Sequence, residues 1–344
     1  MKRLNSISNN SIFRSTALCN DFTKMPLGFI DVGASGGVHP LVLPVASATN
    51  CLCFEASSKA SEELSKIEKS VFANLTVCNT IIGRNNGKTD FYFTESEVNS
   101  SLRQPHDSFL NRYGKKGFQI KERKLMEVRT LDSIVREVSK QYANPGEIIK
   151  LDCQGTEYEI LDAAPETLAK QCLSIWCEVE FFQVYKDQKT FSDVDRLLRS
   201  KGFSLYGLYP KYISKKMLDR TNCETNERLM WADAFYIKDP LEQGHAHTSF
   251  TRRHIYVIIV SALTTGFFDY ALEIIEECID DAKEKVKLQK LTQKLAMQEK
   301  IRLEHHAGQF IEKCRKSPEN TYLFAKKFID ENKNNNDVDF LTVS

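Results

Sequence analysis

The segment that most constrains the fold is 28–37, which reads GFIDVGASGG. An apolar run that ends in an acid and then breaks into glycines is typical of a buried strand that turns tightly into a helix. The glycines leave the backbone of the turn free of side chains, so a ligand can approach it closely. The segment therefore predicts a strand, turn and helix that bind a nucleotide-like cofactor.

The spacing of the glycines distinguishes two classes of cofactor. A dinucleotide site uses G-x-G-x-x-G so that the backbone can approach a pyrophosphate at the helix N-terminus. Here Ser35 takes the place of the second glycine, and Asp31 lies two residues before Gly33. An acid at that position can face the positively charged amino-acid end of S-adenosylmethionine. The pattern favours S-adenosylmethionine over a dinucleotide.

A second acid follows at the distance expected for a ribose contact. The segment 51–57, CLCFEAS, predicts a short apolar strand that ends at Glu55, about 20 residues after the glycine turn. An acid at the carboxyl end of that strand is placed to accept hydrogen bonds from both ribose hydroxyls. The alternative is a solvated charge at the end of a strand.

Two later strands also end in carboxylates. The apolar segment 147–151 leads directly into Asp152, and the next predicted strand, CLSIWCEVEF, places Glu178 and Glu180 on one face. Ligands of an open parallel sheet bind beyond the carboxyl ends of the strands, so we expect Asp152 and Glu178 to face the cofactor crevice. The alternative is that Glu178 and Glu180 pair with nearby Arg and Lys residues.

Strand and helix patterns alternate over residues 26–240 and predict an α/β fold with a doubly wound sheet. Asn86-Gly87 predicts an added β-hairpin. Residues 1–25 are polar and predict a flexible lead-in or one short helix, 241–330 show only helical periodicity, and 331–344 are expected to be disordered. The apolar run 255–268 is too short to span a bilayer, so it predicts a helix packed against the domain or a second subunit; attachment to a membrane surface is the alternative.

Composition and charge limit the partners and the compartment. The net charge of +1 gives no electrostatic footprint for nucleic acid or an anionic membrane. The ten cysteines include no C-x-x-C pair, and the first residues lack the apolar core of a signal peptide, so we expect a cytoplasmic protein. His245, His247 and His254 have no carboxylate or Cys at ligand spacing, and neither does His305-His306, so no metal site is expected.

Five segments in this order resemble the FkbM family of S-adenosylmethionine-dependent methyltransferases, over roughly residues 26–240. They are DVGASGG at 31–37, FEAS at 54–57, VRTLDSIV at 128–135, IIKLDCQGTEYEILDAA at 148–164 and CEVEFFQVYKDQKTFSDVDRLLRSKGF at 177–203. The resemblance implies a Rossmann-like seven-stranded methyltransferase sheet. It also implies methylation of a hydroxyl oxygen, typically on a sugar, glycan, glycolipid or natural product.

The resemblance also implies roles for individual residues. The cofactor loop contains Asp31, Gly33, Ser35 and Gly37, the ribose acid is Glu55, and Asp152 is the acid of the fourth-strand block. Two residues depart from the family pattern: Ser35 stands where Asn is usual, and Ala56 stands where Pro commonly follows the ribose acid. Both replacements are small, and Ser still forms hydrogen bonds.

The sequence therefore predicts an O-methyltransferase. Asp152 is the first candidate for orienting or deprotonating the acceptor hydroxyl, Glu178 is the second, and His106, in the polar loop 99–113, is the third. Asp152 and Glu178 could instead hold a divalent cation. Two other hypotheses stay open: a non-catalytic binding module that assembles as a homo-oligomer through its C-terminal helices, and a nicotinamide dehydrogenase, which Ser35 disfavours.

Overall fold

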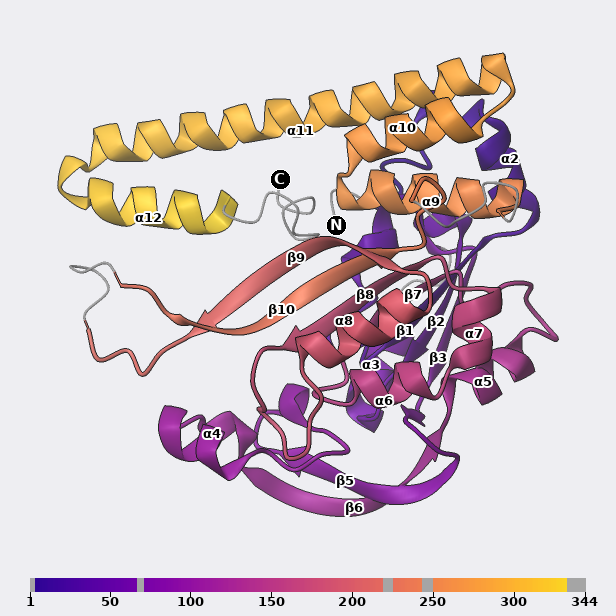
Figure 1. The fold of residues 1–344 in the computed structure, drawn as a ribbon. Coiled ribbons are helices and arrows are strands. Elements are labelled where there is room, and N and C mark those ends of the chain that lie inside the picture. Colours follow the sequence, from indigo (N-terminus) through magenta and orange to yellow (C-terminus); the bar gives the residue numbers. More distant parts are fainter. Residues whose placement is uncertain (1–3, 67–70, 219–224, 243–249, 333–344) are drawn as a thin grey trace.

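The computed structural model describes residues 4–66, 71–218, 225–242 and 250–332. Its centre is a seven-stranded sheet in the order β3-β2-β1-β7-β8-β10-β9 (Figure 1). The strands are β1 (Leu27–Val32), β2 (Thr49–Phe54), β3 (Asn74–Cys78), β7 (Ile148–Leu151), β8 (Ser174–Glu180), β9 (Ser204–Ile213) and β10 (Arg228–Ile237). The pairs from β3 to β8 are parallel, and β10 runs antiparallel to both β8 and β9. The predicted α/β fold is confirmed.

Helices cover both faces of the sheet, which explains why its central strands are apolar throughout. Every residue of β1, β7 and β8 is buried, as expected for parallel strands between two helical layers. One face packs against α5 (Leu131–Val138), α6 (Glu157–Asp162), α7 (Pro165–Lys170) and α8 (Phe191–Ser200). The other face packs against the N-terminal helices, the 3₁₀ segment η1 (Pro40–Ala48) and the C-terminal helices, with α3 (Ser58–Ser65) beside β3.

Of the two predictions for residues 1–25, the structure supports a helical segment and not a flexible lead-in, for the residues that it describes. They form α1 (Ser11–Arg14) and α2 (Ala17–Lys24), and Phe13, Leu18 and Phe22 are at most 1% exposed. Few apolar residues stand among many polar ones here, so the sequence signal is weak, yet Leu18 and Phe22 have the spacing of one helical face. Glu284 fixes α2 in place by accepting hydrogen bonds from the N–H groups of Ala17 and Leu18.

The predicted hairpin is part of a separate three-stranded sheet in the order β4-β6-β5. Its strands are β4 (Ile81–Ile82), β5 (Gly87–Thr94) and β6 (Ile120–Arg129); β5 and β4 both pair with β6, antiparallel and parallel respectively. Only residues 79–80 separate β3 from β4, yet the two strands belong to different sheets. Between β5 and β6 lie η3 (Glu97–Asn99), α4 (Asp107–Tyr113) and η4 (Lys116–Phe118).

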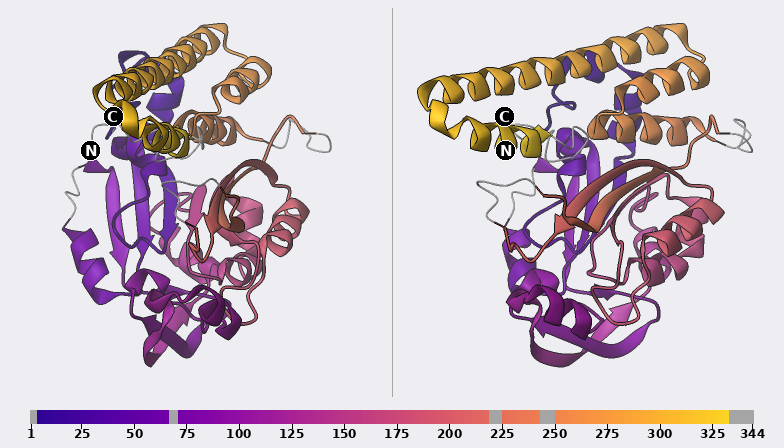
Figure 2. Two further views of the ribbon diagram at one scale, coloured as in Figure 1. Left: turned by 90° about the vertical axis from the view of Figure 1, so that its left-hand side faces the viewer. Right: turned by 60° about the vertical axis from the view of Figure 1, so that its left-hand side comes forward.

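The C-terminal helices form a layer at the opposite end of the molecule from the small sheet (Figure 2). They are α9 (Arg252–Thr265), α10 (Phe268–Cys278), α11 (Ala282–Lys316) and α12 (Thr321–Asn332), with η6 (Pro318–Asn320) before the last. Every residue of α9 from Ile255 to Thr265 is buried, which confirms that the apolar run packs against the domain.

In the described part of the chain, no helix combines the length and apolar character needed to cross a membrane. Of the tail expected to be disordered, 331–332 end α12, and 333–344 lie outside the described residues.

The bidentate contact of Arg253 joins this layer to the sheet. Its guanidinium donates to both carboxylate oxygens of Glu147, at 2.7 Å each, and to Asp21 at 2.6 Å. Glu147 in turn accepts a hydrogen bond from the Gly28 N–H at 2.9 Å. The C-terminal layer is therefore tied to the strand that carries the glycine turn.

Candidate active site

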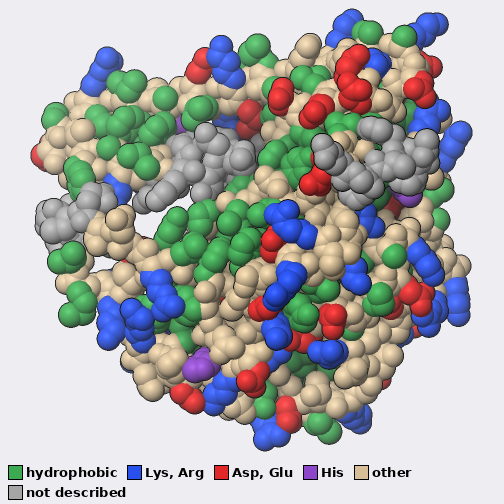
Figure 3. Space-filling model, in the orientation of Figure 1, with side chains coloured by type: hydrophobic (Ala, Val, Ile, Leu, Met, Phe, Trp, Pro, Cys, Tyr) green, Lys and Arg blue, Asp and Glu red, His purple; other side chains and the backbone are tan. Residues whose placement is uncertain are grey.

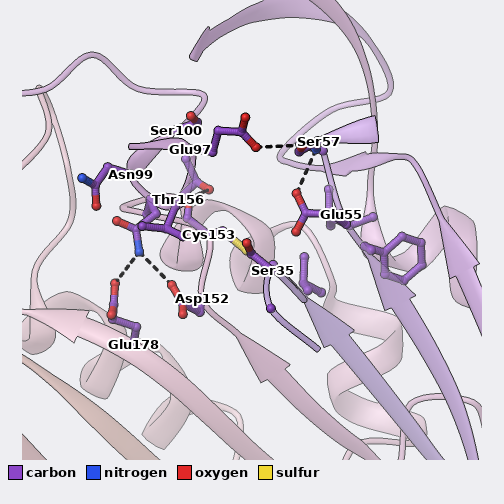
Figure 4. Close-up of a pocket in the computed structure, with 18 of the residues that line it drawn as sticks. Ser35, Glu55, Ser57, Glu97, Asn99, Ser100, Asp152, Cys153, Thr156 and Glu178 are labelled. Carbon is purple, nitrogen blue, oxygen red and sulfur yellow. Dashed lines mark hydrogen bonds between the residues drawn. The ribbon is translucent and has the colours of Figure 1, made fainter. Parts of the chain in front are cut away.

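A cavity of ≈ 630 Å³ lies at the carboxyl ends of β1, β2, β7 and β8, bordered by β4 and β5 of the small sheet (Figure 4). This is the place where open α/β sheets bind ligands. The volume is typical of a site for a small molecule or cofactor. Its walls include the glycine turn and the acids Glu55, Asp152 and Glu178.

The glycine turn combines a tight packing contact with bare backbone. At Gly33 (φ 78°), a Cβ atom would lie 1.9 Å from the Asp152 carbonyl oxygen, so only glycine allows β1 to approach β7 here. Gly36 (φ 87°) and Gly37 (φ 133°) also have left-handed backbone, but a Cβ atom on either would meet nothing within 4 Å. Ser35 is exposed and lines the cavity beside them. The second half of the turn is open to a ligand.

Asp31 does not line the cavity, which contradicts the prediction that it faces the amino-acid end of the cofactor. Its side chain is fully buried; one oxygen accepts a hydrogen bond from the His39 N–H at 2.8 Å, and the other lies 3.2 Å from Lys150 Nζ. Burial alone would lower the pKa of Lys150, but the carboxylates of Asp31 and Asp152 raise it above its usual value. Lys150 also donates to the Gly33 carbonyl oxygen at 2.7 Å. The buried pair of Asp31 and Lys150 therefore stabilises the glycine turn from the protein interior.

Glu55 lies at the end of β2 and lines the cavity, as predicted. It is 7% exposed, and one of its carboxylate oxygens accepts a hydrogen bond from the Ser57 N–H at 2.8 Å (Figure 4). Burial raises the pKa of this carboxyl. The Phe54 carbonyl oxygen accepts from the Gly33 N–H at 3.0 Å, so Glu55 is held directly beside the glycine turn. The second carboxylate oxygen is not used by the Ser57 bond.

Gln154 joins Asp152 and Glu178, a role that the sequence analysis missed. Its Nε2 donates to Asp152 Oδ1 at 2.8 Å and to Glu178 Oε1 at 3.0 Å; dashed lines at the two labelled acids mark these bonds in Figure 4. Its Oε1 accepts from the Tyr185 hydroxyl at 2.9 Å, and its own backbone is left-handed with φ 57°. The amide fixes the two carboxylates relative to each other. The sequence signal that could have indicated this role is the position of Gln154, two residues after the acid Asp152 and before the strand that ends in the acid Glu178.

The carboxylates of this region are crowded in a desolvated wall. Burial raises the pKa of Glu178 well above its ordinary value, and the charges of Asp152 and Glu180 add to the effect. Burial also raises the pKa of Glu157 to about 7, although that side chain accepts hydrogen bonds from the N–H groups of Cys153 and Gly155. Neither Glu178 nor Glu180 forms an ion pair with a described Lys or Arg. The alternative that these two acids pair with nearby Arg and Lys residues is therefore wrong for the part of the chain that the structure describes.

His106 lies outside the cavity, so the structure does not support it as a catalytic candidate. It precedes α4 as the N-cap residue, and its Nδ1 accepts from the Ser108 N–H at 3.2 Å. The other histidines are also separate from the site: His254 belongs to the first turn of α9, and His305-His306 lies on α11. His245 and His247 lie outside the described residues. Within the described ranges, no group of three or more His, Cys, Asp and Glu residues is arranged to hold a metal ion.

The sheet order, the glycine turn and the acid at the end of β2 define the fold of S-adenosylmethionine-dependent methyltransferases. The chain belongs to the FkbM methyltransferase family: the model of the methyltransferase FkbM domain matches residues 31–205, about half of the chain. S-Adenosylmethionine is therefore the cofactor. The site fits this ligand, because Gly36 and Gly37 leave space for it and Glu55 keeps one oxygen beside that space.

Solved methyltransferase structures show only a distant likeness. Magnesium protoporphyrin IX methyltransferase from Synechocystis, with bound S-adenosylmethionine, is 9% identical with a TM-score of 0.31, covering 64% of this chain and 74% of that one. A proposed tRNA methyltransferase from Streptococcus pneumoniae is 9% identical with a TM-score of 0.32, covering 79% of this chain and 93% of that one. Scores this low say nothing about the acceptor. No curated protein sequence matches the chain.

Replacing Glu55 by Gln should weaken S-adenosylmethionine binding about 10- to 100-fold, since a hydrogen bond to a charged acceptor contributes about 1.5–3 kcal/mol. Gln keeps a carbonyl oxygen for the Ser57 N–H, so the fold should be preserved. Isothermal titration calorimetry measures the change. The matched control is Glu63→Gln, an exposed residue of α3. Equal affinities for wild type and Glu55→Gln would show that the carboxylate of Glu55 does not contact the cofactor.

Proposed function

We propose that this protein transfers a methyl group from S-adenosylmethionine to a hydroxyl oxygen of a sugar, glycan or natural product. The observation that carries the proposal is the pair of carboxylates, Asp152 and Glu178, which Gln154 holds in the cavity wall. Asp152 directly follows the strand beside the glycine turn, so these acids adjoin the cofactor loop.

Positioning is the main task of such a site. S-Adenosylmethionine supplies an electrophilic sulfonium methyl group, and holding two reactants in line contributes about 7–11 kcal/mol. The Asp152 side chain is 39% exposed, so it can accept a hydrogen bond from an acceptor hydroxyl and take its proton. Burial, with the charges of Asp152 and Glu180, raises the pKa of Glu178, so a second carboxyl beside Asp152 has an increased affinity for a proton.

The charge of the cavity supports a neutral acceptor rich in hydroxyl groups. The lining carboxylates are those of Glu55, Glu97, Asp152, Glu178, Glu180 and Asp233. Lys150 is the only Lys or Arg among the described lining residues, and its ammonium is committed to Asp31 and the backbone. Carboxylates accept hydrogen bonds from hydroxyls and repel phosphates, which disfavours nucleic acid as the acceptor.

Aromatic side chains in the same wall support a sugar ring in particular. Trp231 and Phe118 line the cavity, and both are partly exposed. In the pairing of β10 with β8, Trp231 lies opposite Glu180 and Asp233 lies opposite Glu178. Alternate residues of a strand share one face, so an apolar ring face and several hydrogen-bond acceptors occur together. A pyranose presents the matching combination of an apolar face and a rim of hydroxyl donors.

A panel of acceptors tests this proposal. Release of S-adenosylhomocysteine should be fastest with neutral oligosaccharides or polyhydroxylated natural products, and it should not rise above background with RNA. The same turnover in the presence of a metal chelator would exclude a divalent cation between Asp152 and Glu178. Fastest turnover with amines would favour N-methylation by an acidic site, and no turnover by a protein that binds the cofactor would favour the non-catalytic binding module.

A further inference from the structure

The distal part of the C-terminal helices folds without a buried residue. In the first half of α11, Leu288 and Leu291 are fully buried against the domain. Among residues 296–329, all of which the structure describes, none is buried. α12 turns back along α11 (Figure 1). Phe328 of α12 stacks on Phe310 of α11, with ring centroids 5.0 Å apart. We call the distal half of α11 together with α12 the arm.

Large apolar side chains gather on this arm (Figure 3). Those at least a third exposed are Met297 (54%), Ile301 (58%), Leu303 (36%), Ile311 (48%), Tyr322 (42%), Leu323 (39%) and Ile329 (58%). Helices in proteins gain most of their stability by packing an apolar face against something else. Monomeric proteins rarely expose large contiguous apolar surfaces, which more often mark an interaction site.

One stripe of α11 has the spacing of a coiled-coil seam. Its members follow each other at alternating intervals of four and three residues, which places them on a single face of the helix. They are Met297, Ile301, Glu304, Gly308, Ile311 and Arg315. Gly308 weakens the interior of a helix, and a Cβ atom there would meet nothing within 4 Å. Its absence of a side chain leaves room for another helix to approach closely.

We propose that the occupant of this stripe is a second copy of the chain, with the two α11 helices antiparallel and crossing near His306. In this alignment Ile301 of one copy packs on Ile311 of the other, and Glu304 lies opposite Gly308. Met297 lies opposite Arg315. Each contact occurs twice, as a two-fold symmetric interface requires.

The charges of the stripe select this orientation. A parallel pair would place Glu304 against Glu304 and Arg315 against Arg315, whereas the antiparallel pair opposes no like charges on the stripe. The residues 296–332 contain seven Lys and Arg against six Asp and Glu. So balanced a surface suits a copy of itself better than a nucleic acid or an anionic membrane.

Sedimentation velocity of the full chain at micromolar concentration tests the proposal. Wild type should be a dimer, and Ile301→Glu or Ile311→Glu should raise the dissociation constant at least about 10-fold, since each introduces a charge into the apolar contact. The control is Val286→Glu, 47% exposed on the same helix but before the overlap, which should dimerise as wild type does. All these positions are exposed, so circular dichroism should show unchanged helix content.

A charge rescue tests the orientation. Gly308→Glu should weaken the dimer, because it sets a second carboxylate against Glu304 of the other copy, and the double variant Gly308→Glu with Glu304→Lys should dimerise more tightly than Gly308→Glu alone. A wild-type monomer at all concentrations would overturn the proposal, and so would a dimer that resists both Ile substitutions. A monomer that dimerises only after deletion of 333–344 would assign the stripe to the chain's own tail instead.

Discussion

Turnover should fall about 10²- to 10⁴-fold in Asp152→Asn, the range typical of a positioned acid or base. Asn keeps the size of the side chain and one acceptor oxygen, so Gln154 Nε2 can still donate to it at the 2.8 Å now observed. The charge that orients or deprotonates the acceptor hydroxyl is lost. Because Asp152 is 39% exposed, its replacement should leave the melting temperature and the affinity for S-adenosylmethionine almost unchanged.

The measurement is kcat beside the melting temperature and the cofactor dissociation constant of the same variant. Asp162→Asn is the matched control, since that carboxylate is also partly exposed and pairs with Arg84 on the surface at 3.3 Å. It should keep wild-type kcat. Normal kcat with a lowered melting temperature in Asp152→Asn would instead make Asp152 a structural residue of the turn before α6.

The largest loss of stability is expected from Lys150→Met. Removing one partner of a buried ion pair leaves the other charge without compensation and typically costs about 3–5 kcal/mol. The side chain of Lys150 is 7% exposed and that of Asp31 is fully buried. The free energy of unfolding, measured by denaturant titration, should fall by about that amount.

Two further variants separate the loss of the buried ion pair from the general effect of replacing Lys by Met. Lys170→Met removes a surface partner of Glu166, where Lys170 is 71% exposed, and should change the free energy of unfolding by less than about 1 kcal/mol. Adding Asp31→Leu to Lys150→Met removes the unpaired charge and should recover much of the lost stability. A Lys150→Met variant no less stable than Lys170→Met would show that the pair is not what holds the turn.

The sequence predicted best the parts of the fold that are apolar throughout. β1, β7 and β8 are buried on both faces, so their continuous apolar runs stand out without any knowledge of their neighbours. β6, in contrast, begins at Ile120 without a run of buried residues. Residues 120–125 are all exposed, and only the pairing with β5 makes them a strand. No periodic pattern in the sequence indicates the pairing of β6 with β5.

The residues of the site also differ in how far the sequence could predict their roles. Ser35, Glu55, Asp152 and Glu178 follow directly from the rule that ligands bind where parallel strands end, and all four line the cavity. The structural role of Asp31 did not follow, because its partner Lys150 is distant in sequence and meets it only through the register of β1 with β7. His106 was chosen for its residue type in a long loop, and its capping role depends on where α4 begins.

The position of the transferred methyl group tests the central claim most directly. The product formed with methyl-¹³C S-adenosylmethionine and the best neutral acceptor should show, by NMR, a labelled carbon bonded to a hydroxyl oxygen. Its mass should rise by one methylene unit plus the label, and Asp152→Asn should form it at least about 100-fold more slowly. A labelled methyl on nitrogen, on a carboxylate or on RNA would contradict the account.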